Sequence, residues 1–86
     1  MPYAIVMRRQ AQKKLQSLAR DERIRLAEKI NQLGHNPDDP ALDTKRLSGV
    51  PLYRLRVGDW RIIYDRQDAV QIIAIEKIKP RGDAYK

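Results

Sequence analysis

The chain has 86 residues, carries 18 lysines and arginines against 11 aspartates and glutamates, and contains no cysteine. That length predicts one small domain spanning residues 1–86, and a composition of 42% hydrophobic and 34% charged residues excludes intrinsic disorder. The missing cysteines exclude a disulfide framework and thiolate chemistry. Because the sequence has no secretory signal and no bilayer-spanning apolar run, we expect a soluble, cytoplasmic protein. The formal net charge of +7 favours a polyanionic partner: nucleic acid, an acidic protein or an anionic membrane.

The first half of the chain predicts one strand followed by a helical hairpin. Residues 3–7, YAIVM, form a short apolar run of β-prone side chains. Residues 8–19 place their apolar side chains on one helical stripe of a surface that is otherwise Lys, Arg and Gln. A second helix is expected to take Asp21 as its N-cap and to end at Gly34, after a short break around Arg20.

The second half predicts three strands joined by short turns. Residues 35–44, HNPDDPALDT, are rich in proline, asparagine and aspartate and predict a loop. Residues 45–51 lead into a hairpin over 53–65, and a last strand with the apolar sequence AVQIIAI covers 69–78. The order of elements predicts an α+β fold. In it, the N-terminal strand and the helical hairpin pack on one face of an antiparallel sheet whose last three strands form a meander.

The hairpin centres on Gly58-Asp59, a two-residue loop in which glycine supplies the positive φ of a primed turn. This turn predicts that Val57 pairs with Trp60, Arg56 with Arg61, Leu55 with Ile62 and Tyr53 with Tyr64. Because side chains alternate between the two faces of a strand, the aromatic and aliphatic members of these pairs share the core face. The other face receives Arg54, Arg56 and Arg61.

Three arginines on one face need an explanation. Like charges directly opposite each other destabilise a sheet, and two unit charges about 4 Å apart repel by about 1 kcal/mol even in water. A phosphate between the arginines would turn this repulsion into attraction, because a guanidinium donates two parallel hydrogen bonds. From the pattern alone, charges that only solvate the sheet and discourage edge pairing are an equally good explanation.

The turn before the last strand determines what lies beside these arginines. A loop at Gln67-Asp68 would pair Ile63 with Ile72 and Arg61 with Ala74, so that the residue next to the cations is small. The same face would also carry Leu52, Val70 and Glu76. The sequence therefore predicts a basic centre with an aliphatic border.

Residues 47–64, LSGVPLYRLRVGDWRIIY, together with Arg81 and Tyr85, resemble the RelE/ParE superfamily of bacterial and archaeal type II toxins. The order of elements resembles that superfamily over nearly the whole chain and implies a RelE-like toxin fold. Its RelE branch consists of endoribonucleases that cut messenger RNA in the ribosomal A site, generally without a catalytic metal or other cofactor. The resemblance implies a catalytic set of Arg54, Arg56, Arg61, Arg81 and Tyr85. The best-known member has lysines at the positions of Arg54 and Arg56, which is a departure.

The chemistry implied by this resemblance is attack of a ribose 2′-OH on its own 3′ phosphate, giving a 2′,3′-cyclic phosphate and a free 5′-OH. Arg61 and Arg81 would stabilise the extra negative charge of the transition state. Tyr85 would stack on a base or orient the 2′-OH, and Arg56 or Arg81 would donate to the leaving oxygen.

Further cations are expected to contact RNA: Lys45, Arg46, Lys77, Lys79, Arg8, Arg9 and Lys13. Those of the first helix are explained equally well as a solvated face. The resemblance implies the ribosome and messenger RNA as partners, and a cognate antitoxin whose acidic or amphipathic segment covers the basic face. The toxin would be a monomer within the toxin-antitoxin complex and would reach operator DNA only through the antitoxin, with no membrane partner.

Other functions fit the same sequence. A ParE-like toxin would inhibit DNA gyrase by binding alone, and a basic nucleic-acid-binding domain would have no catalysis. The departures at Arg54 and Arg56 also leave room for an inactive relative of the toxins. A metal site is not expected, because the only histidine, His35, lies in a turn-rich loop and the nearby aspartates suit turns: Asp38, Asp39 and Asp43.

Overall fold

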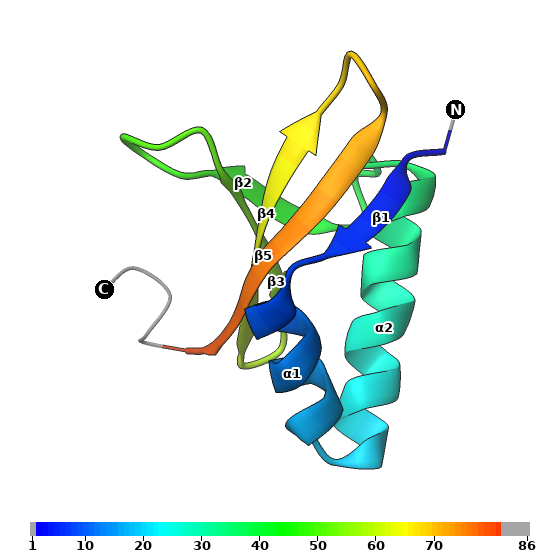
Figure 1. Ribbon diagram of the computed structural model, residues 1–86, viewed down its shortest axis with the longest axis vertical. Coiled ribbons are helices and arrows are strands. Elements are labelled where there is room, and N and C mark those ends of the chain that lie inside the picture. The colour runs from blue at the N-terminus through cyan, green and yellow to red at the C-terminus, as the bar shows by residue number, and fades with distance from the viewer. Residues whose placement is uncertain (1, 82–86) are drawn as a thin grey trace.

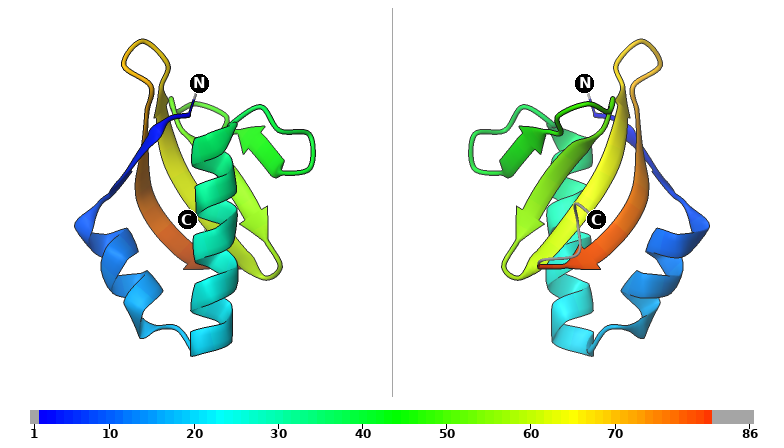
Figure 2. Two further views of the ribbon diagram at one scale, coloured as in Figure 1. Left: turned by 90° about the vertical axis from the view of Figure 1, so that its right-hand side faces the viewer. Right: turned by 90° about the vertical axis from the view of Figure 1, so that its left-hand side faces the viewer.

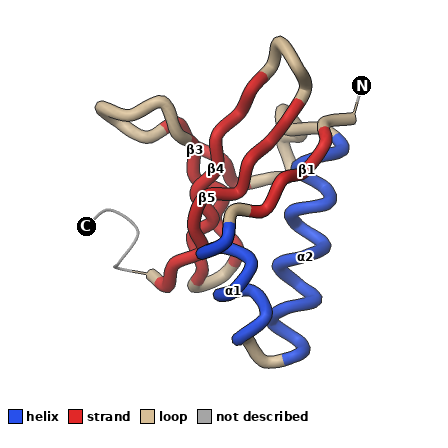
Figure 3. Tube along the Cα trace, in the orientation of Figure 1, coloured by secondary structure: helices blue, strands red, loops and turns tan. Residues whose placement is uncertain are grey.

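The computed structural model describes residues 2–81. The elements in chain order are β1 (Ala4–Met7), α1 (Arg9–Ser17), α2 (Arg20–His35), β2 (Asp43–Arg46), β3 (Tyr53–Val57), β4 (Trp60–Gln67) and β5 (Ile72–Pro80). The strands, which are red in Figure 3, form one sheet in the order β1-β5-β4-β3-β2. Both helices lie on the same face of this sheet (Figures 1 and 2). These features confirm the predicted α+β class, and we call the face opposite the helices the open face.

The sheet is mixed, not antiparallel as predicted, because β1 joins it as a parallel edge strand and does not pack on its face. The sheet also includes a strand that the sequence did not predict. β1 runs parallel to β5, because the two helices return the chain to the same end of the sheet before the later strands begin. β2 pairs antiparallel with β3. The predicted loop over residues 35–44 was therefore wrong for Asp43 and Thr44, which are the first two residues of β2. The sequence of β2, DTKR, has no apolar residue to reveal it, and its backbone pairing with β3 makes it a strand.

The ends of α2 also differ from prediction. The helix begins at Arg20 with Ala19 in the N-cap position, so Asp21 lies in the first turn, where its charge still complements the helix dipole. Gly34 does not end the helix. It is buried inside the last turn, where an added Cβ would lie 2.8 Å from Ile5 Cδ1. The glycine therefore allows β1 to approach the helix closely.

The core lies between α2 and the sheet. Leu26 and Leu33 of α2 and Leu55 and Ile62 of the sheet have no exposed surface. Tyr64 is buried beside them, and its ring stacks on that of Tyr53 with centroids 5.5 Å apart. This confirms that the aromatic and aliphatic residues of the hairpin point toward the helices.

The two hairpins of the sheet compare differently with the prediction. The β3–β4 register is the predicted one, including the direct pairing of Arg56 with Arg61. The predicted β4–β5 register was wrong: Ile63 pairs with Lys77 and Arg61 pairs with Lys79. The turn occupies residues 68–71, and the ladder has an irregularity between Ile63 and Tyr64. Both features shift the pairing, and neither has a clear signal in the sequence.

Arg66 ties three segments together at the β4–β5 end of the sheet. Its guanidinium donates to both carboxylate oxygens of Asp38 (2.8 and 3.0 Å) and to Asp68 (2.6 Å), and it lies over the ring of Tyr3. These contacts hold the pKa of both carboxyl groups below the usual range. Because Arg66 is committed to this network, we do not count it among the cations available to a ligand.

Candidate nucleic-acid interface

A row of cations crosses the centre of the open face. Arg56 of β3 pairs with Arg61 of β4, which pairs on its other side with Lys79 of β5. Directly opposed residues of antiparallel strands have Cβ atoms about 5 Å apart, so three positive charges occupy adjacent positions. The small residue predicted beside Arg61 is instead a lysine, because Ala74 pairs with Asp65. The concentration of charge is greater than the sequence indicated.

A second row lies next to the first. Lys45 of β2 pairs with Arg54, which pairs with Ile63, and Ile63 pairs with Lys77 of β5. The carboxylate of Asp43 sits at the β2 edge of the first row, opposite Arg56. The open face thus carries cations from β2 to β5.

Arg61 is a buried cation. Only 8% of its surface is exposed, and its Nη1 donates to the backbone carbonyls of Gly58 (3.3 Å) and Trp60 (3.2 Å). A charge with so little contact with water needs polar partners, and the carbonyls of the β3–β4 turn supply them. Arg61 therefore presents a positive charge at a fixed place.

The two arginines of β3 differ from each other. Arg54 donates from Nη2 to Asp43 Oδ1 at 3.0 Å, and its side chain is 14% exposed. Its Nε is buried and has no hydrogen-bond partner among the described residues. Arg56 is exposed, and no hydrogen bond or ion pair joins its side chain to another residue of 2–81. Arg56 is the arginine of this hairpin that is best placed to meet a ligand.

The remaining members of the expected catalytic set lie elsewhere. Arg81 follows β5 directly, and its backbone N–H donates to the Asp59 carbonyl at 2.7 Å. Arg81 is exposed at the tip of the β3–β4 hairpin and lines a cavity there with Asp59 and Trp60. Tyr85 lies outside the described residues.

A groove of about 770 Å³ lies at the β2 side of the open face, and residues of the loop between β2 and β3 form part of its lining. This loop projects from the sheet in Figure 1. Its lining includes cations expected to contact RNA: Lys45, Arg46, Lys77 and Lys79. Leu52 and Glu76 also line it, as predicted for this face, and Leu52 agrees with the predicted aliphatic border. Val70 does not, since it lies in the β4–β5 turn and is 61% exposed. The groove can therefore accept a ligand with both negative charge and apolar surface.

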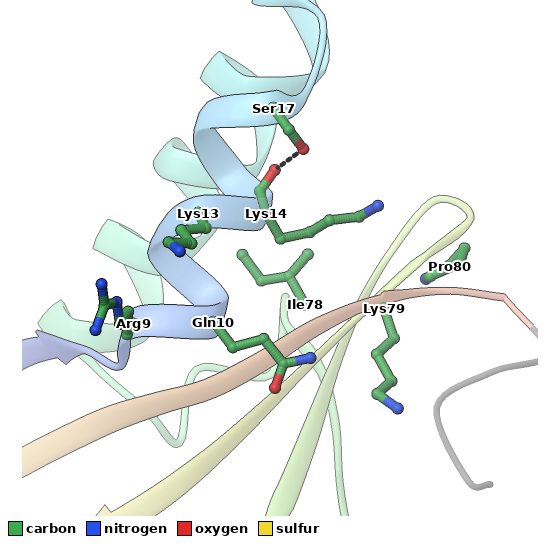
Figure 4. Close-up of a pocket in the computed structure, with 8 residues that line it drawn as sticks. All are labelled: Arg9, Gln10, Lys13, Lys14, Ser17, Ile78, Lys79 and Pro80. Carbon is green, nitrogen blue, oxygen red and sulfur yellow. Dashed lines mark hydrogen bonds between the residues drawn. The ribbon is translucent and has the colours of Figure 1, made fainter.

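A second groove of about 840 Å³ runs between α1 and the end of β5 (Figure 4). Arg9 and Lys13 line it, whereas Arg8 is paired with Glu76 at 3.3 Å. Figure 4 shows Ile78 pointing from β5 toward α1 and Lys79 pointing to the other side of the strand. Because Lys79 lines both grooves, the basic surface continues from α1 across β5 to β2.

The acidic residues set aside in the sequence have structural partners. Asp39 accepts a hydrogen bond from the Ala41 backbone N–H at 2.9 Å, which confirms its role in a turn, and Asp38 binds Arg66. Within residues 2–81, no three residues among His, Cys, Asp and Glu are grouped so that they could hold a metal ion. Sequence reasoning missed Asp43 as the partner of Arg54, because it did not identify β2.

Comparisons with known proteins agree on a class. A sequence model described as "ParE toxin of type II toxin-antitoxin system, parDE" matches residues 5–85. The chain is similar to RelE in the archaeal RelE–RelB complex from Pyrococcus horikoshii OT3, with a TM-score of 0.82 and 36% identity over 98% of this chain and 100% of that one. A search of curated proteins finds no significant match.

More distant structures share the fold. The toxin of the RelB–RelE antitoxin–toxin complex from Methanococcus jannaschii has a TM-score of 0.76 and 23% identity, covering 94% of this chain and 95% of that one. A RelE mutant from E. coli in the free state has a TM-score of 0.77 and 20% identity, covering 99% and 88%. Fold and sequence together define a toxin of the type II toxin-antitoxin class. The chain belongs to the ParE toxin family, within the RelE/ParE superfamily. No helix of residues 2–81 is long and apolar enough to cross a membrane.

Proposed function

We propose that this toxin is a ribosome-dependent endoribonuclease of the RelE type that cuts messenger RNA. The observation that carries the proposal is the row of Arg56, Arg61 and Lys79 on the open face. These cations repel one another unless an anion lies between them, and a phosphodiester has the charge and the oxygen acceptors to fill that place. The 36% identity with an archaeal RelE supports the RelE assignment.

The proposed reaction is transesterification. The ribose 2′-OH loses its proton and its oxygen bonds to the adjacent phosphorus, the bond from phosphorus to the 5′ oxygen breaks, and that oxygen takes up a proton. The products are a 2′,3′-cyclic phosphate and a 5′-OH. Negative charge gathers on the phosphoryl oxygens in the transition state, so cations that are already in place stabilise it more than the ground state.

The geometry favours different roles for the arginines. Arg61 is buried and held by two carbonyls, which suits a preorganised charge that stabilises the phosphoryl oxygens. Arg56 is exposed and suits direct contact with the phosphate or the leaving oxygen. Arg81 completes the clamp from the end of β5, and Tyr85 is proposed to stack on a base. The ribosome supplies the remaining alignment of the messenger.

Partners follow from the same proposal. An antitoxin with an acidic, amphipathic segment would neutralise the open face. The same segment would bury the aliphatic residues in the groove of that face, such as Leu52 and Ile63. Solved relatives were crystallised with RelB antitoxins, which supports this partner. We propose that the toxin is a monomer in that complex, acts in the cytoplasm and meets operator DNA only through the antitoxin.

A second candidate function is inhibition of DNA gyrase by binding, because the family that matches the sequence is the ParE toxin family. Binding to gyrase does not require cations to converge on one phosphate. The nuclease therefore explains the Arg56–Arg61–Lys79 row better, and the two functions are separable by assay.

The test is incubation of the purified protein with ribosomes carrying a defined messenger, followed by mapping of the RNA ends, with a gyrase supercoiling assay in parallel. We expect cleavage that requires the ribosome, leaves a 2′,3′-cyclic phosphate and is accompanied by normal supercoiling. Arg81→Ala is expected to reduce cleavage at least about 100-fold, whereas Arg23→Ala, which removes the same charge from an exposed position on α2, is expected to have no effect. Intact messenger together with inhibited gyrase would assign the protein to the ParE activity instead.

A further inference from the structure

Trp60, the first residue of β4, is held by both helices. Its indole Nε1–H donates a hydrogen bond to Glu22 Oε2 of α2, and Lys14 Nζ of α1 lies 5.5 Å from the centroid of its ring. A hydrogen bond to a charged acceptor is about twice as strong as a neutral one, and a cation over an indole ring is attracted to it. The start of β4 is therefore fixed from the helix side.

The turn before Trp60 rests on the same helix. An added Cβ at Gly58 would lie 2.8 Å from Arg25 Nη2, so the Arg25 guanidinium lies directly against the turn. Gly58 also has a φ of 59°, which independently favours glycine. Glu22 and Arg25 are three residues apart and share one face of α2. One short face of α2 therefore supports the whole tip of the hairpin.

The β3–β4 turn also makes hydrogen bonds with two of the arginines of the proposed site. Arg61 Nη1 is bonded to the carbonyls of Gly58 and Trp60, and the Arg81 N–H is bonded to the carbonyl of Asp59. Every one of these acceptors belongs to residues 58–60. Whatever fixes the backbone of those residues also fixes the guanidinium of Arg61 and the backbone from which the Arg81 side chain extends.

We propose that Glu22 and Trp60 are positioning residues, whose hydrogen bond holds the β3–β4 turn and, through it, keeps Arg61 and Arg81 in register with the scissile phosphate. The catalytic part of this inference rests on the proposed nuclease function. Trp60 belongs to the core face of the hairpin and Glu22 to α2, so both act from beneath the sheet while RNA binds the open face. A displacement of 1 Å at a reacting centre can cost about 100-fold in rate, so a loosened turn reduces turnover.

Substitutions at both ends of this contact test the proposal. Trp60→Phe keeps a ring but removes the N–H, and Glu22→Ala removes the acceptor. Both are expected to lower kcat for ribosome-dependent cleavage about 10-fold with KM unchanged. Glu22→Gln keeps an acceptor oxygen and is expected to retain most of the activity. Gly34→Ala disturbs the opposite end of α2 and serves as the control for a general loss of stability. Its kcat, measured well below the unfolding temperature of the variant, is expected to equal that of the wild-type protein.

A second readout separates this inference from the nuclease proposal. The NMR resonance of Arg61 Nε–Hε and the amide exchange of residues 58–61 are expected to change in Trp60→Phe and Glu22→Ala and to stay unchanged in Gly34→Ala. If the wild-type protein cuts no messenger but these signals change, the nuclease proposal fails and the positioning role stands. Unchanged Arg61 signals, or a kcat that falls equally in Gly34→Ala, would overturn the positioning role.

Discussion

Asp43 occupies the guanidinium of Arg54, which the proposed function would otherwise offer to an RNA phosphate. The two side chains are joined at 3.0 Å, but Asp43 is 56% exposed, so the pair contributes little to stability. Removing the carboxylate releases Arg54 to a phosphate. We therefore expect Asp43→Asn to strengthen binding of a single-stranded RNA oligonucleotide and to make the slope of log K against log salt more negative by up to about 0.7.

The measurement is fluorescence anisotropy with a labelled oligonucleotide across a range of salt concentrations. Glu28→Gln removes the same charge from an exposed position on α2 and is the matched control. If both variants steepen the slope equally, the effect comes from net charge and Arg54 has no particular role.

Tyr64 makes stability depend on alkaline pH. Burial raises the pKa of its hydroxyl to about 12, whereas in the unfolded chain it ionises near 10. The unfolded state therefore loses its proton first, so the stability contributed by the neutral buried tyrosine is complete below pH 10 and lost as the pH rises toward 12. Urea titrations at pH 9, 10 and 11 should show this decline, and Tyr64→Phe should flatten it. Parallel curves for the two proteins would show that other groups cause the loss.

For single residues, the sequence predicted which arginines share a face but not which contacts each of them makes there. Alternation along a strand places Arg54, Arg56 and Arg61 together. The bond from Arg54 to Asp43 depends on an unrecognised strand, and the bonds from Arg61 to the turn depend on a side-chain rotamer. Neither kind of information is present in a spacing pattern.

Among the elements, the contact between α2 and β1 depends on the missing side chain of Gly34. Alanine would favour the helix by about 1 kcal/mol, but its Cβ would meet Ile5 Cδ1 at 2.8 Å, and such overpacking costs about 1–3 kcal/mol. We expect Gly34→Ala to lower the free energy of unfolding by about 1 kcal/mol in urea titrations. The loss should shrink in an Ile5→Ala background. An equal loss in both backgrounds would mean that Ile5 is not the obstacle.

Whether the register of a hairpin could be predicted from the sequence depended on its turn. Gly58-Asp59 has one favourable turn geometry, so the β3–β4 register followed from two residues. Residues 68–71 adopt a longer turn in which Gln71 has a φ of 55°. Positive φ is uncommon for glutamine, so the residue type did not predict this turn. β2 becomes a strand only because β3 offers an edge, which is a tertiary effect.

For the whole molecule, the position of the charges matters more than their sum. The formal net charge of +7 is compatible with many anionic partners. The fold covers one face of the sheet with α1 and α2 (Figure 2). It leaves the other face to Arg56, Arg61 and Lys79, with further cations continuing to α1. This arrangement predicts two kinds of cation: a central group that acts on the transition state and an outer group that only binds.

A comparison of Arg56→Ala with Arg9→Ala tests this central claim most directly, because both side chains are exposed arginines and only Arg56 lies in the central row. The measurement is the steady-state rate of messenger cleavage on programmed ribosomes as a function of ribosome concentration. We expect Arg56→Ala to lower kcat at least about 100-fold with little change in KM, and Arg9→Ala to raise KM with kcat unchanged. Equal effects of the two substitutions on KM, with kcat unchanged in both, would contradict the claim that the central row acts on a phosphate.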